Sequence, residues 1–133
     1  MKFNKNVQNN RRIIGNAGER AAAKYLRDRG FIILHTNYRC PMGEIDLVAR
    51  KCSLLVFAEV KTRSSADFAL PEESVTNEKQ KKITRSAYYY INKYKLDHLE
   101  CQFDIFSIYV NEKGRVTKIE HLPDAFDVTV APL

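Results

Sequence analysis

The chain has 133 residues, of which 44% are hydrophobic, and its formal net charge is +6 at pH 7. A chain of this length buries one core, and its longest apolar run, from Leu54 to Ala58, is far shorter than the ~20 residues of a membrane-spanning helix. The positive charge favours a polyanionic partner, because cations that face phosphates release condensed counterions on binding. We therefore expect one domain that does not enter a membrane.

The two ends of the chain and its cysteines indicate where the protein resides. The first 14 residues form a basic tail without the apolar segment or the cleavage site of a secretion signal. Cys40, Cys52 and Cys101 cannot all pair with one another, and none has a CxxC spacing. We predict a cytoplasmic protein with a basic tail over residues 1–14, one domain over 15–127 and a C-terminal tail over 128–133.

The first half of the domain reads as one helix followed by strands. A helix is expected over Asn16–Gly30, because Asn is a good N-cap and Gly suits a C-terminal stop. β-branched and aromatic residues predict strands over Phe31–Arg39 and Glu44–Arg50, separated by a turn. The near-continuous apolar run in Ser53–Lys61 predicts a central strand that is covered on both faces.

The second half completes an α/β pattern. Residues 62–74 are expected to form a loop long enough to move over a ligand, and apolar spacing predicts a helix over residues 75–94. Cys101–Val110 and Val116–His121 are expected to be strands joined by a hairpin turn. The order α-β-β-β-α-β-β predicts a mixed sheet flanked by helices.

Charged residues on the second and third strands form the candidate site. Alternation along a strand places Glu44 and Asp46 on one face, and likewise Glu59 and Lys61. Glu59 directly follows an apolar run, where an unpaired carboxylate would cost several kcal/mol. Either a divalent ion shared with Asp46 or a salt bridge to Lys61 or Arg63 would compensate it.

Glu19 is a third candidate carboxylate. It lies on the apolar side of the first predicted helix and can point inward. The order Asn16-Ala17-Gly18-Glu19 also fits a capping box, in which the Glu side chain binds the backbone of the N-cap residue. Local sequence leaves both interpretations open.

Several separated motifs carry a family resemblance. Gly18-Glu19, Gly43-Glu44-Ile45-Asp46-Leu47 and Phe57-Ala58-Glu59-Val60-Lys61-Thr62-Arg63 resemble the signature of the YraN family, and Ser74-Val75-Thr76, Lys79-Gln80 and Phe103-Asp104 continue the match. The resemblance implies a restriction-endonuclease-like fold with the PD-(D/E)xK nuclease core, similar to archaeal Holliday junction resolvases. Glu19, Asp46, Glu59 and Lys61 stand at its motif positions, with Ile45 where the motif name has proline.

The resemblance implies a metal-dependent mechanism. Asp46 and Glu59 would hold Mg²⁺ or Mn²⁺, with Glu19 completing the shell and the carbonyl of Val60 as a further ligand. Lys61 would orient the attacking water or stabilise the transition state. We expect no small-molecule cofactor.

Further residues are candidates for contact with nucleic acid, which we expect to be DNA. Gln80 is predicted on the Ala87 side of the second helix, either as a surface amide or reaching the phosphate, and Lys82 on the opposite, solvated face. The full candidate set is Glu44, Arg39, Arg63, Lys79, Gln80 and Lys82. The sequence is also compatible with a non-catalytic nucleic-acid-binding module or a protein adaptor with a vestigial site, and with a homodimer.

Overall fold

The computed structural model describes residues 17–64 and 75–127. The chain begins with a helix over residues 17–28, which we call the N-terminal helix. The elements that follow are β1 (Ile32–Cys40), β2 (Gly43–Lys51), β3 (Leu54–Ser64), α2 (Asn77–Tyr94), β4 (Glu100–Val110) and β5 (Val116–Phe126). The predicted order α-β-β-β-α-β-β is confirmed.

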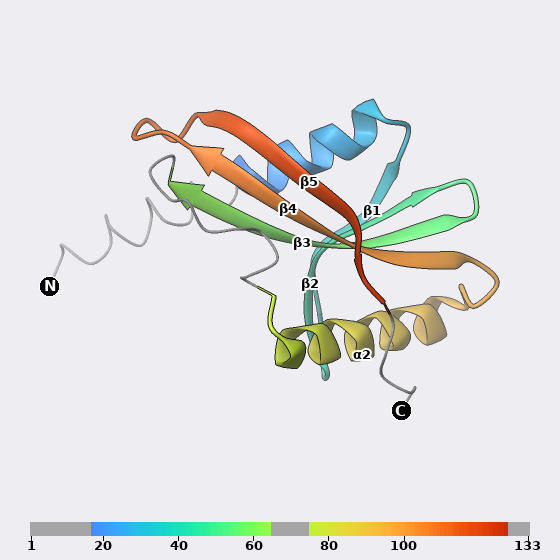
Figure 1. Ribbon diagram of the computed structural model, residues 1–133. Coiled ribbons are helices and arrows are strands. Elements are labelled where there is room, and N and C mark those ends of the chain that lie inside the picture. Colours follow the sequence, from blue (N-terminus) through green and yellow to red (C-terminus); the bar gives the residue numbers. More distant parts are fainter. Residues whose placement is uncertain (1–16, 65–74, 128–133) are drawn as a thin grey trace, which may run out of the picture.

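The strands form one mixed sheet in the order β1-β2-β3-β4-β5 (Figure 1). β3 and β4 are parallel and are connected through α2, whereas the other neighbouring pairs are antiparallel. β3 is therefore the central strand, as its apolar run predicts. The expected α/β class and flanking helices are confirmed, in agreement with a restriction-endonuclease-like fold.

One helix packs on each face of the sheet and buries a separate apolar cluster. The N-terminal helix contributes Ala22, Ala23 and Leu26 to a cluster with alternate residues of β2, β3 and β4. On the other face, α2 contributes Ile83, Ala87 and Tyr90 to a cluster that includes Phe57 and Phe103. These two layers hold the helices rigidly against the strands that carry the candidate site.

Local interactions set the ends of α2. The Thr76 hydroxyl caps the helix by accepting a 3.3 Å hydrogen bond from the Lys79 N–H. At the other end Lys95 adopts a left-handed conformation, with φ of 55°, and its N–H binds the carbonyl of Ile91. The helix thus begins at Asn77 rather than at residue 75.

Two strands are longer than the sequence predicts. β3 continues through Thr62 to Ser64 because β4 pairs with it as far as Ser64↔Val110. β5 continues past His121 to Phe126, although it contains Pro123. A proline is tolerated there because β5 is an edge strand, so its outward N–H positions need no partner.

The expectations for the two tails and for a mobile loop concern residues that lie largely outside the described ranges. The tails fall on residues 1–14 and 128–133, and most of the expected loop falls on 65–74. In the part of the chain that is described, no helix is both long and apolar enough to cross a membrane. Cys40, Cys52 and Cys101 are free thiols.

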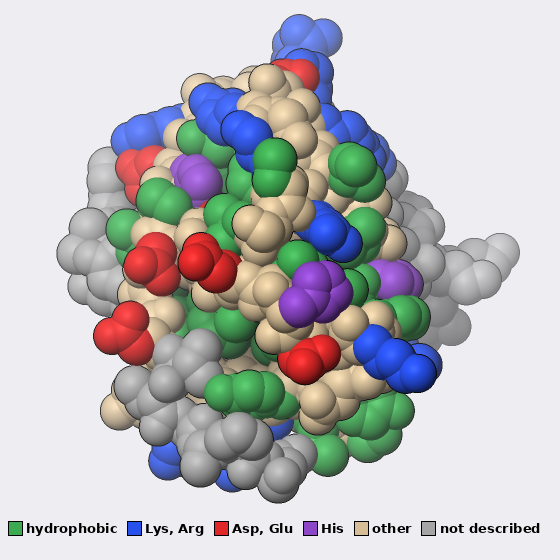
Figure 2. All heavy atoms as spheres, turned by 90° about the vertical axis from the view of Figure 1, so that its right-hand side faces the viewer, with side chains coloured by type: hydrophobic (Ala, Val, Ile, Leu, Met, Phe, Trp, Pro, Cys, Tyr) green, Lys and Arg blue, Asp and Glu red, His purple; other side chains and the backbone are tan. Residues whose placement is uncertain are grey.

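One end of the molecule carries charges of both signs. Figure 2 shows the end of the molecule that lies to the right in Figure 1, where acidic, basic and hydrophobic side chains are intermixed. The described side chains on that end do not form a patch of one sign.

Candidate functional site

The site forms where β2 and β3 separate. Their pairing runs from Lys51↔Leu54 to Leu47↔Ala58, after which β2 continues beside β1 and β3 continues beside β4. We call this opening the fork. At its apex the N–H of Val60 on β3 donates a 2.8 Å hydrogen bond to Asp46 Oδ2 on β2. A side chain therefore takes the place of a backbone acceptor and is fixed at the fork.

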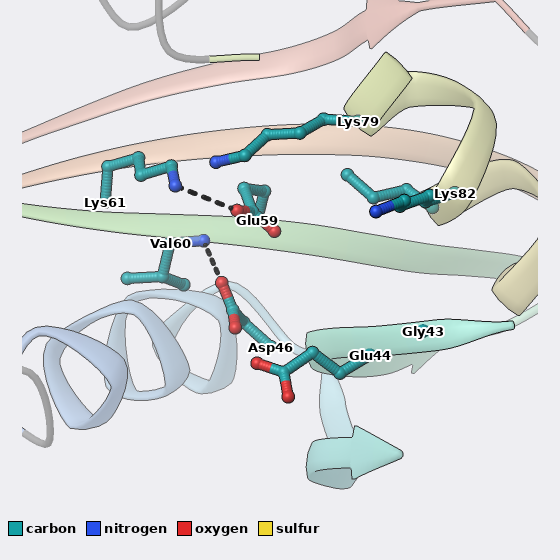
Figure 3. Close-up of a pocket in the computed structure, with 9 residues that line it drawn as sticks. Gly43, Glu44, Asp46, Glu59, Val60, Lys61, Lys79 and Lys82 are labelled. Atoms are coloured by element: carbon teal, nitrogen blue, oxygen red, sulfur yellow. Dashed lines mark hydrogen bonds and ion pairs between the residues drawn. The ribbon is translucent and has the colours of Figure 1, made fainter. Parts of the chain in front are cut away.

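The fork opens into a cavity of about 440 Å³, which we call the carboxylate cavity (Figure 3). Figure 3 shows acidic side chains from β2 and β3 on one side and lysines from α2 on the other. The lining residues are Gly43, Glu44, Asp46, Glu59, Val60, Lys61, Lys79, Lys82 and Ile83. The structure thus gathers Glu44, Asp46, Glu59 and Lys61 as alternation along the two strands predicts.

Glu59 forms an ion pair with Lys61. The Lys61 Nζ lies 3.2 Å from Glu59 Oε1, and the two side chains are 26% and 15% exposed. The salt-bridge alternative for Glu59 is therefore realised in the structure. This ion pair occupies only one oxygen of the Glu59 carboxylate. The second oxygen is oriented into the cavity.

Asp46 is the most perturbed acid of the site. Burial, followed by the nearby Glu59 carboxylate, raises the pKa of Asp46 from 3.8 to about 7. The Val60 N–H opposes this rise, whereas Glu19 and a hydrogen bond with Glu59 add to it. Near neutral pH Asp46 is therefore partly protonated, and a bound cation would displace that proton.

Two lysines interact at the rim of the cavity. A hydrogen bond with Lys61 and burial lower the pKa of Lys79. Burial by itself would lower the pKa of Lys61. The hydrogen bond with Lys79 and the negative charge of Glu59 have the larger effect, so the pKa of Lys61 is raised. Lys79 therefore faces the same centre as the carboxylates, from the first turn of α2.

Glu19 lies beside this centre but does not line the same cavity. The Asn37 side chain on β1 donates a 2.9 Å hydrogen bond to Glu19 Oε2, and Asn37 itself has a left-handed backbone with φ of 50°. Glu19 is near enough to Asp46 to raise its pKa. It instead borders a neighbouring cavity formed with Thr36 and the N-terminal helix.

The chemistry of the site suits a hard divalent cation. Within the described residues, no three acidic, histidine or cysteine side chains are gathered as a complete metal-binding group. Mg²⁺ needs only one or two carboxylates, because waters and substrate phosphates complete its octahedral shell. Asp46 and Glu59 supply those oxygens, and the carbonyl of Val60 leaves β3 on the same edge as its N–H. The donor set fits Mg²⁺ or Mn²⁺.

The other predicted nucleic-acid contacts have different locations. Lys82 was expected on the face of α2 that points away from the site. The structure corrects this, because the Lys82 side chain is exposed but lines the carboxylate cavity. Gln80 donates a 3.2 Å hydrogen bond to the carbonyl of Val75 and does not line the cavity. Arg39 is exposed and lies 3.5 Å from Glu44, with which it forms an ion pair.

Arg63 and Gly18 complete the surroundings of the site. Arg63 is half-buried on β3, two residues beyond Lys61, and its Nε has no hydrogen-bond partner in the described structure. Gly18 packs so closely on β3 that an added Cβ would overlap the Thr62 hydroxyl. This contact fixes the end of the helix that carries Glu19.

Sequence reasoning missed Asn37 and a hydrogen-bonded group on β4 and β5. The buried Asp104 accepts from His121 Nε2 at 2.7 Å, from Gln102 and from the N–H of Asp124. His121 also contacts the Tyr25 hydroxyl on the N-terminal helix at 3.3 Å. No local sequence signal pairs Asp104 with His121, because the two residues are 17 positions apart on neighbouring strands and their contact depends on the register of β4 and β5 and on the docking of the helix that carries Tyr25.

Comparison with known proteins gives consistent matches along most of the chain. Residues 18–108 match the model of "Uncharacterised protein family UPF0102". The UPF0102 protein of Dictyoglomus turgidum is 46% identical over 88% of this chain and 99% of its own. Those of Caldicellulosiruptor saccharolyticus and Moorella thermoacetica are 39% and 44% identical, over 88% and 87% of this chain and 99% and 97% of theirs. The resemblance to the YraN family is thereby confirmed.

Proposed function

Because the chain belongs to the uncharacterised protein family UPF0102, whose name assigns no activity, we propose a function from the site itself. We propose that the protein is a Mg²⁺- or Mn²⁺-dependent nuclease that hydrolyses phosphodiester bonds in DNA, including branched or single-stranded structures. Its location would be cytoplasmic, which the three free thiols support.

One observation carries this proposal. Three carboxylates, with Asp46 and Glu59 at the centre and Glu44 beside them, and three lysines meet in one cavity where the strands β2 and β3 separate. Carboxylates alone would suit a stored cation, and lysines alone would suit a bound anion. Their combination suits a substrate that brings negative charge to a metal, as a phosphodiester does.

The residues have distinct roles in this mechanism. Asp46 and Glu59 would hold the ion, with the Val60 carbonyl and Glu19 as further oxygen ligands. When bound, the ion supplies a water of lowered pKa and neutralises charge on the scissile phosphate. Lys61, which is paired with Glu59, would orient the attacking water or stabilise the transition-state charge.

Cleavage assays test the proposal directly. Labelled linear, single-stranded, flapped and four-way-junction DNA should be incubated with Mg²⁺ or Mn²⁺ and with Glu59→Gln or Lys61→Met protein. The exposed Lys118–Glu120 pair on β5 is a matched control, since it has the same residue types two positions apart. Loss of cutting in the site variants, with activity retained in Lys118→Met and Glu120→Gln, supports the nuclease. Absence of metal-dependent cutting of every substrate refutes it.

The alternative is a nucleic-acid-binding module without catalysis. The Glu59–Lys61 ion pair favours it, because a carboxylate already neutralised by an ammonium has less need of a cation. Under this alternative, wild type and Asp46→Asn bind DNA equally and neither cuts. Cutting of both strands of a duplex would further suggest a homodimer, which light scattering of the DNA complex would test.

A further inference from the structure

A second cavity lies next to the carboxylate cavity, between the N-terminal helix and β1. Its volume is about 190 Å³, and it is lined by Glu19, Arg20, Ala23, Arg27 and Thr36. We call it the arginine cavity. Neither the metal site nor the lysines of α2 account for its two arginines.

The arginines are arranged in a row along the helix. Arg20 and Arg27 are seven residues apart, which places them on one face about two turns, or ~10.5 Å, from each other along the axis. Ala23 lies between them in sequence, and its small side chain lines the same cavity. The Thr36 side chain faces the same space from β1.

These two arginines differ from the other cations close to them in sequence. Lys24 pairs with Asp28 at 2.7 Å, and the Arg29 guanidinium stacks over the Tyr25 ring at 3.3 Å. The side chains of Arg20 and Arg27, in contrast, form no ion pair or hydrogen bond within the described residues. Glu19, the acid of the cavity, is already bound by Asn37. The guanidinium groups are thus available to an outside anion.

The two cavities lie on either side of the carboxylates. Glu19 borders the arginine cavity and acts electrostatically on Asp46, which lines the carboxylate cavity. In Figure 3 the N-terminal helix runs beside Asp46, whereas α2 brings Lys79 and Lys82 from the opposite side. Cations therefore approach the acids from both helices, Lys79 and Lys82 from α2 and the two arginines from the N-terminal helix.

We propose that Arg20 and Arg27 bind backbone phosphates of a nucleic-acid strand that crosses the site from α2 to the N-terminal helix. This proposal rests on the nuclease function proposed above, and it defines the path of the substrate. A small free anion would need one arginine or an adjacent pair. Two guanidinium groups two helical turns apart instead match a polymer with phosphates at intervals.

Salt-dependent binding tests the path separately from catalysis. Anisotropy of a labelled single-stranded oligonucleotide should be measured in EDTA, without cutting, over a range of salt concentrations. Each lost phosphate contact reduces the slope of log K against log salt by ~0.7, so Arg20→Gln/Arg27→Gln should reduce it by ~1.4. At 0.1 M salt this corresponds to a loss of affinity of about 25-fold.

The control removes the same two charges elsewhere. Lys113→Gln/Arg115→Gln lies in the β4–β5 turn, at the edge of the sheet opposite β1. We expect its slope to stay near that of the wild type, and we expect Arg20→Lys/Arg27→Lys to restore most of the loss.

The outcomes separate the two proposals. Equal slopes for the Arg20→Gln/Arg27→Gln and control variants would overturn the path, as would a wild type that does not bind nucleic acid. If the arginine variant alone loses slope but no substrate is cut, the path stands and the nuclease fails.

Discussion

Replacing Asp46 by Asn should stabilise the metal-free protein at alkaline pH. The amide is isosteric with the protonated acid, so its oxygen can still accept from the Val60 N–H and its NH₂ can donate to Glu59. The variant therefore keeps the local contacts and removes the cost of ionising a buried acid beside another carboxylate.

The expected gain follows from the pKa of Asp46. The folded value is raised to about 7 from 3.8, so between these values the folded state holds a proton that the unfolded state has released. Stability of the wild type thus falls as pH rises from about 4, and the full penalty applies above about 7. At ~1.36 kcal/mol per pKa unit, the penalty is about 4 kcal/mol at pH 8 and under ~1 kcal/mol at pH 4.

Thermal unfolding in EDTA measures this difference. For a domain of this size, about 4 kcal/mol corresponds to a rise in Tm of ~10–15 °C for Asp46→Asn at pH 8. Addition of Mn²⁺ should raise the Tm of the wild type and leave that of the variant nearly unchanged. Asp28→Asn is the control, because Asp28 is exposed and pairs only with a surface lysine.

Either of two results would contradict a raised pKa of Asp46 as the cause. One is an Asp46→Asn protein that is no more stable than the wild type at pH 8. The other is a gain of the same size at pH 4 and pH 8, which would show that the effect does not come from ionisation of Asp46.

Three further predictions concern the site and its supports. Gly18→Ala should cost ~1–3 kcal/mol because its Cβ would overlap the Thr62 hydroxyl, and Thr62→Ala should recover part of this in urea unfolding; no recovery would point to another cause. His121→Ala should cost ~3 kcal/mol by leaving the buried Asp104 without its 2.7 Å partner, and His121→Gln should cost less; equal costs would contradict this role. Binding of Mn²⁺ at pH 6.5 should release protons from the Asp46 pair, so the calorimetric enthalpy should depend on the buffer, and this dependence should vanish near pH 9.

The central part of the fold was predictable because a short, continuous stretch of sequence indicates it. The run from Leu54 to Ala58 can be buried only if layers cover both of its faces, which places β3 in the middle of the sheet. Glu59 directly follows this run and lies where β2 and β3 separate. Alternation along two strands was sufficient to bring Asp46 and Glu59 into one cavity.

The rotation of α2 about its axis was less predictable. Helical periodicity identifies the apolar face of α2 but not how that face is turned relative to the fork. Consecutive side chains are rotated by about 100° around the helix axis, so a small rotation decides which of them reaches the cavity. Lys82 lies at the border of that face, where Gly43 leaves space beside it, so it lines the cavity. Gln80 instead binds the carbonyl of the buried Val75 at the helix entrance.

The position of Glu19 depends on a contact that sequence does not reveal. Its expected alternative partner, the backbone of Asn16, lies outside the described residues. The partner that the structure shows is Asn37, whose left-handed backbone on β1 turns its amide toward the helix. Such a contact depends on strand register and helix docking together, and neither is encoded in the local pattern around Glu19.

The topology of the sheet also orders the meeting of these charges during folding. Asp46 and Glu59 lie on consecutive antiparallel strands joined by a short turn, so nearby segments bring the two acids together. Lys79 arrives with α2, whose docking accompanies the long crossover between the parallel strands β3 and β4. Closing that crossover is slower because more chain entropy must be lost. Lys61 follows Glu59 on the same strand, so the two acids meet with one cation already beside them. Docking of α2 then adds Lys79 to the same centre, and the charges of the site are complete only after the crossover has closed.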